Sequence, residues 1–125
     1  MDTENKKILI VDDDAFLIDM YALKFTQNNF IVSTAFNGKE AIEKLNAGFS
    51  PDIILLDIMM PEMDGFQVYK SIRTEPLLSI IPFIFLSALS DQLNIRFGMG
   101  LGADDYITKP FVNSELIEAV RNRIA

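Results

Sequence analysis

The sequence predicts an α/β fold, a doubly wound open sheet of five parallel strands with five helices. Short apolar runs alternate with segments of helical spacing along all 125 residues. The apolar runs are continuous, which is typical of strands covered by helices on both faces. Alternating strands and helices favour right-handed crossovers and a parallel sheet, and a closed eight-unit barrel would need a longer chain. We therefore interpret residues 1–125 as a single domain.

The candidate strands are five short runs that end at polar or turn residues. They cover residues 7–11, 31–35, 52–56, 80–86 and 105–108. Their content of isoleucine, valine, leucine and phenylalanine favours extended structure.

The candidate helices fill the intervals between these runs. They include residues 18–29, 37–45, 64–75, 91–100 and 113–124. Ile18, Tyr21 and Phe25 lie on one face of the first helix at three- and four-residue steps. Asn37 with Glu40 three residues later predicts a capping box at the start of the second. Two glycines weaken the helical propensity of the fourth.

The composition excludes several kinds of chemistry. The chain has no cysteine and no histidine, which excludes disulfides, zinc-thiolate sites and imidazole catalysis. Its formal net charge of -7 argues against direct binding of nucleic acid. No signal-peptide pattern or membrane-length apolar run is present, so we expect a cytoplasmic protein without membrane contact.

Polar side chains gather where the predicted strands end. Asp12 and Asp13 follow the first strand, Asp57 the third, Ser87 the fourth and Lys109 the fifth. The carboxyl ends of parallel strands form the ligand crevice of an open sheet. Clustered carboxylates suit Mg²⁺, and an aspartate can accept a phosphoryl group whose oxygens an amine and a hydroxyl would stabilise. The sequence therefore predicts a phosphoryl-accepting site at this edge.

Three motifs in this order resemble the receiver domain of two-component response regulators. They are ILIVDDD at 8–14, DIMMPEMDG at 57–65 and GADDYITKPF at 102–111. Ser87 followed by Ala88 occupies the hydroxyl position between the last two. The resemblance covers essentially the whole chain. It implies a flavodoxin-like fold with strand order 2-1-3-4-5.

The resemblance also implies roles for the acidic residues. Asp57 would receive a phosphoryl group from a sensor histidine kinase or a histidine phosphotransfer protein. Asp13, Asp57 and the backbone carbonyl of Met59 would bind Mg²⁺, with Mn²⁺ as a substitute, and Asp12 would act mainly through water. The chain would thus be a phosphoacceptor without turnover of an external substrate.

The remaining roles implied by the resemblance concern the response to the phosphoryl group. Lys109 would pair with the phosphate, and the bond between Lys109 and Pro110 would be cis. Ser87 and Tyr106 would form a switch pair. The readout would be a shifted surface on helix 4, strand 5 and helix 5, which contacts an output partner.

Two apolar residues bear on how long the acyl phosphate lasts. Met59 and Leu89 stand two positions after Asp57 and Ser87, respectively. An apolar side chain at these positions cannot orient an attacking water, so we expect a comparatively long-lived acyl phosphate.

Taken one at a time, the motifs allow other interpretations. Three consecutive aspartates are commonly a solvated turn or a helix cap, and we interpret Asp14 as a first-turn acid favoured by the helix dipole. A magnesium-dependent phosphatase with an aspartyl phosphate usually carries a second aspartate two residues on, where Asp57 is followed by Met59. A degenerate receiver that only binds a partner is a third alternative. The sequence leaves open the cognate kinase, the output target, phosphorylation-dependent homodimerisation, and whether the chain acts alone or within a longer regulator or hybrid kinase.

Overall fold

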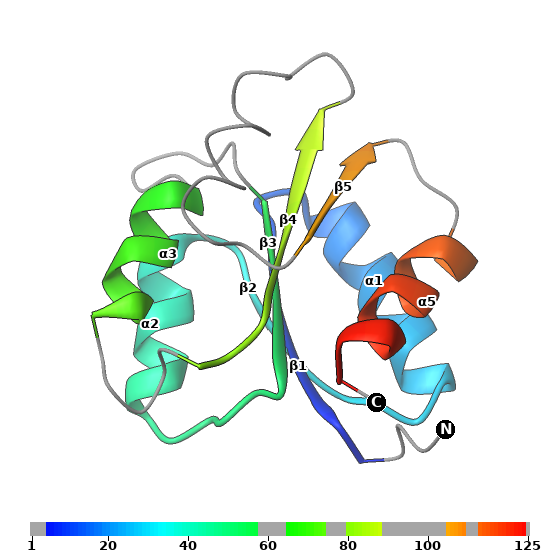
Figure 1. Cartoon of the computed structure of the whole chain (residues 1–125), viewed down its shortest axis with the longest axis horizontal. Coiled ribbons are helices and arrows are strands. Elements are labelled where there is room, and N and C mark those ends of the chain that lie inside the picture. The colour runs from blue at the N-terminus through cyan, green and yellow to red at the C-terminus, as the bar shows by residue number, and fades with distance from the viewer. Residues whose placement is uncertain (1–4, 58–64, 75–79, 89–104, 110–112, 125) are drawn as a thin grey trace.

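The fold is a single parallel sheet with helices on both faces (Figure 1). The computed structural model describes residues 5–57, 65–74, 80–88, 105–109 and 113–124. Five strands lie in the order β2-β1-β3-β4-β5, which confirms the predicted fold class and strand order. The strands are β1 (Lys7–Val11), β2 (Ile31–Ala35), β3 (Ile53–Asp57), β4 (Phe83–Ala88) and β5 (Asp105–Lys109).

Two pairs of helices cover the two faces of the sheet (Figure 1). One pair is α1 (Ala15–Gln27) and α5 (Asn113–Ile124), and the other is α2 (Gly38–Asn46) and α3 (Gly65–Arg73). The fourth predicted helix, residues 91–100, lies outside the described residues. Within the described part of the chain, every helix is too short or too polar to cross a bilayer.

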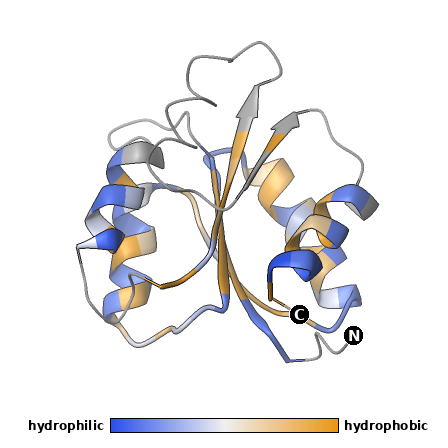
Figure 2. Ribbon diagram, in the orientation of Figure 1, coloured by the Kyte–Doolittle hydropathy of each residue, from blue (hydrophilic) through white to orange (hydrophobic). Residues whose placement is uncertain are grey.

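The alternation of strand residues sorts the core into two clusters. Leu9, Ile54 and Phe83 pack on the side of α2 and α3, while their neighbours in sequence pack on the side of α1 and α5. All residues of β1 after Lys7 and all of β3 are buried, because the inner strands are covered on both faces. The strands therefore form the hydrophobic centre of the molecule (Figure 2).

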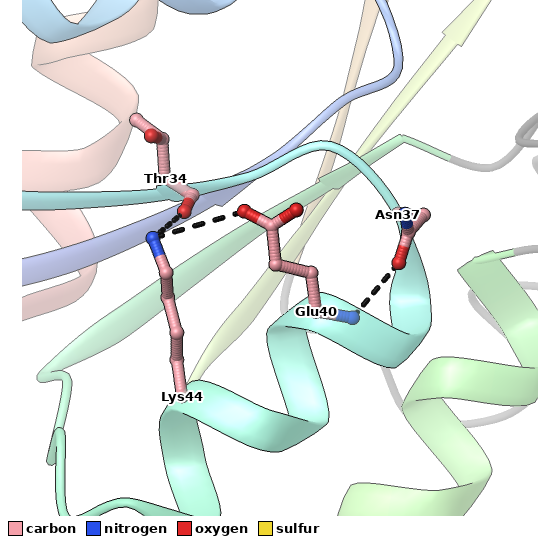
Figure 3. A network of polar contacts seen from close by, with 4 residues as sticks. All are labelled: Thr34, Asn37, Glu40 and Lys44. Atoms are coloured by element: carbon pink, nitrogen blue, oxygen red, sulfur yellow. Dashed lines mark hydrogen bonds and ion pairs between the residues drawn. The ribbon is translucent and has the colours of Figure 1, made fainter.

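Helix α2 has the predicted N-cap, Asn37, while the Glu40 side chain of the predicted capping box pairs with Lys44. The side-chain oxygen of Asn37 accepts a hydrogen bond from the Glu40 backbone N–H at 2.8 Å (Figure 3). The Glu40 carboxylate lies 3.9 Å from Lys44 Nζ, which also donates to the Thr34 carbonyl of β2. These contacts fix the start of α2 and attach its last turn to the edge strand β2.

Arg73 joins the end of α3 to the approach to β4. Its guanidinium lies 4.8 Å from the ring centroid of Tyr69 and 4.9 Å from that of Phe83. The same group donates a hydrogen bond to the Ile81 carbonyl at 2.9 Å. Stacking and hydrogen bonding thus act together at the edge where β4 begins, opposite its carboxyl end.

Several predicted boundaries move by one turn or less. The fourth strand begins at Phe83, not at residue 80, because Pro82 has no N–H for a ladder and Ile80 is 85% exposed. The first helix ends at Gln27, and Asn29 has a left-handed φ of 69°. The third and fifth strands extend to Asp57 and Lys109, one residue beyond their predicted ends.

Candidate functional site

The register of the inner strands brings Asp12 and Asp57 together. Val11 is the Cα partner of Leu56, so the residues that follow them occupy neighbouring positions at the carboxyl edge of the sheet. The Asp12 backbone N–H donates to the Ala35 carbonyl at 3.1 Å, which holds the β1 end against β2 as well. The predicted convergence of these two aspartates therefore follows from strand pairing.

Asp13 completes a group of three carboxylates. One carboxylate oxygen from each of Asp12, Asp13 and Asp57 lies within 4.8 Å of the other two. Asp12 is 0% and Asp57 6% exposed, whereas Asp13 faces solvent. Negative charges packed this closely repel one another, and the repulsion is strongest for the two buried groups, where solvent screens it least.

Asp14 belongs to the same turn but has a different role. It is the N-cap of α1, and its Oδ1 accepts hydrogen bonds from the N–H groups of Phe16 (3.0 Å) and Leu17 (3.2 Å). The helix-cap interpretation of this turn is therefore confirmed at Asp14, and only its placement in the first turn is wrong by one position, since no acidic residue lies there. The backbone N–H of Asp14 donates to Asp12 Oδ1 at 3.1 Å.

Tyr21 is a site residue that the sequence reasoning placed only in the core. Its side chain is 1% exposed on the α1 face that packs against the sheet. Burial raises the pKa of its hydroxyl above the ordinary value, and the charges of Asp12, Asp57 and Asp14 raise it further. A tyrosine in an apolar helix stripe, two turns after an acidic loop, was the available signal.

Ser87 and Lys109 lie at the same edge by backbone register alone. Ser87 is paired with Thr108, and Lys109 is paired with Ala88 at the last position of the ladder between β4 and β5. Tyr106 is paired with Phe85. The side chains of Ser87, Tyr106 and Lys109 are outside what the structure describes, so their roles stay predictions.

The predicted Met59 carbonyl ligand, the hydrolysis position Leu89 and the Lys109–Pro110 bond also stay predictions. Met59, Leu89 and Pro110 lie outside the described residues.

The chemistry of the described cluster suits a hard divalent cation. Mg²⁺ prefers oxygen ligands and is commonly held by one or two carboxylates together with water and a substrate phosphate. Asp13 and Asp57 offer such oxygens from two chain segments that are neighbours in space but far apart in sequence. The exposure of Asp13 leaves room for water and for an incoming group.

Solved structures share this fold closely. A putative response regulator from Chloroflexus aurantiacus has a TM-score of 0.90 and 32% identity, covering 97% of this chain and 98% of that one. The receiver domain of the Francisella response regulator 1452 has a TM-score of 0.86 and 38% identity, covering 96% and 97%. Chemotaxis protein CheY4 of Vibrio cholerae has a TM-score of 0.89 and 27% identity, covering 95% and 98%.

Curated relatives are longer than this chain. The alkaline phosphatase synthesis transcriptional regulatory protein PhoP of Bacillus subtilis is 38% identical over 94% of this chain and 48% of its own length. The DNA-binding response regulator MtrA of Mycobacterium tuberculosis is 37% identical over 99% of this chain and 53% of its own. The chain thus spans about half the length of these relatives.

The family model of the response regulator receiver domain matches residues 8–121, a range that holds the acidic turn, the inner strands and the whole sheet apart from the first residue of β1. The resemblance stated from the three motifs is therefore confirmed, and the chain belongs to the response regulator receiver domain family.

Proposed function

We propose that this chain is the phosphoacceptor switch of a two-component phosphorelay, with Asp57 as the residue that receives the phosphoryl group. The observation that supports it best is the cluster of Asp12, Asp13 and Asp57 at the carboxyl edge of β1 and β3. Asp57 ends an inner strand and is 6% exposed.

The transfer needs only one bond exchange at phosphorus. A carboxylate oxygen of Asp57 attacks the phosphorus of a phosphohistidine, and an O–P bond forms. The P–N bond of the donor breaks, and its electron pair returns to the imidazole nitrogen of the donor protein. The low exposure of Asp57 keeps bulk water from most of the acceptor, which favours transfer over hydrolysis.

Mg²⁺ bound by Asp13 and Asp57 would neutralise negative charge shared between the acceptor and the phosphoryl oxygens. Asp12 is buried, and one of its oxygens is engaged by the Asp14 N–H, so it fits a supporting role better than a full share of the ion. Lys109 and Ser87, at the ends of β5 and β4, would contact the phosphoryl oxygens.

The partners follow from the same chemistry. The donor would be a sensor histidine kinase or a histidine phosphotransfer protein. The output would pass through helix 4, strand 5 and helix 5, with Ser87 and Tyr106 as the switch pair, to an output domain or protein. PhoP and MtrA are described as transcriptional and DNA-binding regulators, and this chain matches about half of each. That this chain does not itself bind nucleic acid stays a prediction from its charge.

We further propose that the chain does not turn over an external substrate. The competing function is a magnesium-dependent phosphatase, which would place a second aspartate two residues after the nucleophile. This chain has Met59 at that position. Release of phosphate from a generic phosphate ester, in catalytic excess over protein, would overturn the assignment.

The direct test is phosphorylation by a small donor. Wild-type protein, Asp57→Asn and Asp52→Asn are incubated with Mg²⁺ and acetyl phosphate, and intact masses are measured. Wild type and Asp52→Asn should each gain one phosphoryl group, and Asp57→Asn should gain none. Asp52 is the matched control, because it lies just before the same strand at the opposite edge of the sheet.

A second reagent covers the case of a short-lived acyl phosphate. Beryllofluoride mimics the phosphoryl group on an aspartate and does not hydrolyse as an acyl phosphate does. If acetyl phosphate adds no mass and beryllofluoride leaves the amide NMR signals of Asp12 and Asp13 unchanged, the proposed function is wrong. A mass gain by Asp57→Asn equal to that of wild type would move the acceptor to another residue.

A further inference from the structure

Asp14 accepts hydrogen bonds through both its side chain and its backbone carbonyl, although it is exposed. Its carboxylate accepts from the N–H groups of Phe16 and Leu17, and its own carbonyl accepts the first helical hydrogen bond, from Ile18 at 3.0 Å. Two of the first free N–H groups of α1 are thereby satisfied by one side-chain oxygen. The position of Asp14 is therefore tied to the position of α1.

The position of α1 is in turn fixed by the core. Ile18, Tyr21 and Phe25 of this helix are 2%, 1% and 0% exposed and pack against the sheet with β1 and β3 residues. A shift of the helix relative to the strands would have to disturb this packing. Because it caps α1, Asp14 is held in place by this buried helix face.

The backbone of Asp14 passes this restraint to Asp12. The Asp14 N–H donates to Asp12 Oδ1 at 3.1 Å, and Asp12 is completely buried. With one oxygen directed at this donor, the Asp12 carboxylate has a defined orientation next to Asp13 and Asp57. The carboxylate of Asp14, by contrast, is directed at the helix and takes no part in the cluster of three.

We infer that Asp14 is a positioning residue for the cation site: by capping α1 it holds the acidic turn in the geometry that the site needs, and its negative charge is not what matters. The inference rests on the proposed function, in which this cluster binds Mg²⁺. In this arrangement the N-cap of α1 sets the orientation of the Asp12 carboxylate.

The test separates the cap from the charge. Asp14→Ala removes both, whereas Asp14→Asn and Asp14→Ser remove the charge and keep a capping side chain. Mg²⁺ is titrated into the full chain, and its dissociation constant is read from the amide NMR shifts of residues 12 and 13. We expect Asp14→Ala to weaken Mg²⁺ binding about tenfold, the lower end of what loss of a supporting partner costs a metal site. Asp14→Asn and Asp14→Ser should stay within about twofold of wild type, because an exposed charge is screened.

A second helix supplies the control for general destabilisation. Asn37→Ala removes the cap of α2, where Asn37 accepts from the Glu40 N–H, and should cost the fold a similar amount. Its affinity for Mg²⁺ should equal that of wild type.

The outcomes are distinct. Equal weakening in Asp14→Ala and Asp14→Asn would assign the effect to charge and overturn the inference. Wild-type affinity in Asp14→Ala, or equal weakening in Asn37→Ala, would also overturn it. Absence of Mg²⁺ binding by wild-type protein, seen as no shift at millimolar concentration, would instead contradict the proposed function, and the inference would fall with it.

Discussion

At the scale of single residues, burial decides how the acidic cluster and its neighbour behave. Asp12, Asp57 and Tyr21 are all nearly inaccessible to solvent, so the carboxylate charges act on one another and on the tyrosine hydroxyl with little screening. Burial raises the pKa of the Tyr21 hydroxyl, and the charges of Asp12, Asp57 and Asp14 raise it further. The hydroxyl therefore stays protonated and adds no negative charge of its own.

Tyr21 makes the stability of the fold sensitive to high pH. Its pKa is raised in the folded state, so its contribution is complete below the ordinary tyrosine pKa of about 10 and is lost as pH rises above it. In Tyr21→Phe the free energy of unfolding should fall less steeply with pH than in wild type, by up to about 1.4 kcal/mol per pH unit above pH 10. Urea unfolding at pH 8 to 11 measures it, and identical slopes for Tyr21→Phe and wild type would contradict the assignment.

The lifetime of the acyl phosphate is a second residue-scale property. Met59 and Leu89 are apolar, and we expect that neither orients an attacking water. The double variant Met59→Asn, Leu89→Glu supplies groups that accept hydrogen bonds from water, so it should lose phosphate faster than wild type. The decay is followed by intact mass after removal of the donor. Equal decay in both proteins would count against the hypothesis.

At the scale of elements, the helices and strands are fastened at their ends by few, specific side chains. Asp14 and Asn37 begin α1 and α2, and Arg73 joins the end of α3 to β4. Each of these residues satisfies backbone groups that the element itself leaves unpaired. The stability of these element ends therefore depends on single residues, whereas the stability of the core comes from many apolar contacts.

Arg73 offers a test of this dependence. Arg73→Ala removes a hydrogen bond to the Ile81 carbonyl and the stacking on Tyr69 and Phe83, which should destabilise the fold by about 2 kcal/mol. Arg73→Lys keeps the charge without the planar group, so it should be destabilised by only part of this free energy. Chemical denaturation measures both, with the exposed Lys39→Ala as control. A midpoint for Arg73→Ala equal to that of Lys39→Ala would refute the role.

The sequence predicts the elements well where the pattern is long and less well where local chemistry decides. The unbroken runs identify the five strands and their parallel pairing, and the stripe of Ile18, Tyr21 and Phe25 identifies the buried face of α1. The start of β4 is misplaced, because hydrophobicity at residues 80 and 81 outweighed the missing N–H of Pro82. Apolar runs report burial, whereas strand ends are set by hydrogen bonds, which composition does not display.

The candidate site is predictable for a related reason. Strand ends converge in a parallel sheet, so Asp12, Asp13 and Asp57 could be grouped without coordinates, and the structure brings them together. A helix cap was one of the interpretations of the three aspartates, and Asp14 is that cap. Its link to Asp12 was not accessible from the sequence, because it depends on a backbone hydrogen bond that residue types do not display.

At the scale of the whole molecule, negative charge is concentrated where the sheet is most buried. The chain carries a formal net charge of -7, and three carboxylates meet at the carboxyl ends of the neighbouring inner strands β1 and β3. The fold tolerates this arrangement because Asp12 directly follows β1 and Asp57 ends β3, two strands whose apolar residues form the core. A bound cation would relieve the repulsion and favour the native state.

Mg²⁺ should therefore stabilise the whole domain. At a concentration one hundred times the dissociation constant, binding to the native state alone adds about 2.7 kcal/mol. Thermal unfolding with Mg²⁺ and with EDTA at equal ionic strength measures the gain. Asp13→Asn should abolish most of it and should be more stable than wild type without Mg²⁺, because one repelling charge is gone. Asp19→Asn, an exposed carboxylate on α1, should respond to Mg²⁺ as wild type does. A full gain in Asp13→Asn would remove that residue from the cation site.

The pairing of β1 with β3 has a kinetic consequence. Residues 8–11 pair with residues 53–56, which are far away in the sequence. Bringing such distant segments together has a large entropic cost, and this step slows the folding of parallel α/β domains. The same pairing brings Asp12 and Asp13 up to Asp57, so the repulsion between these carboxylates opposes it. Dissolved Mg²⁺ should accordingly shorten the refolding time as well as lengthen the lifetime of the native state. Pairing of β1 with β3 thus builds the centre of the sheet and the acidic cluster together.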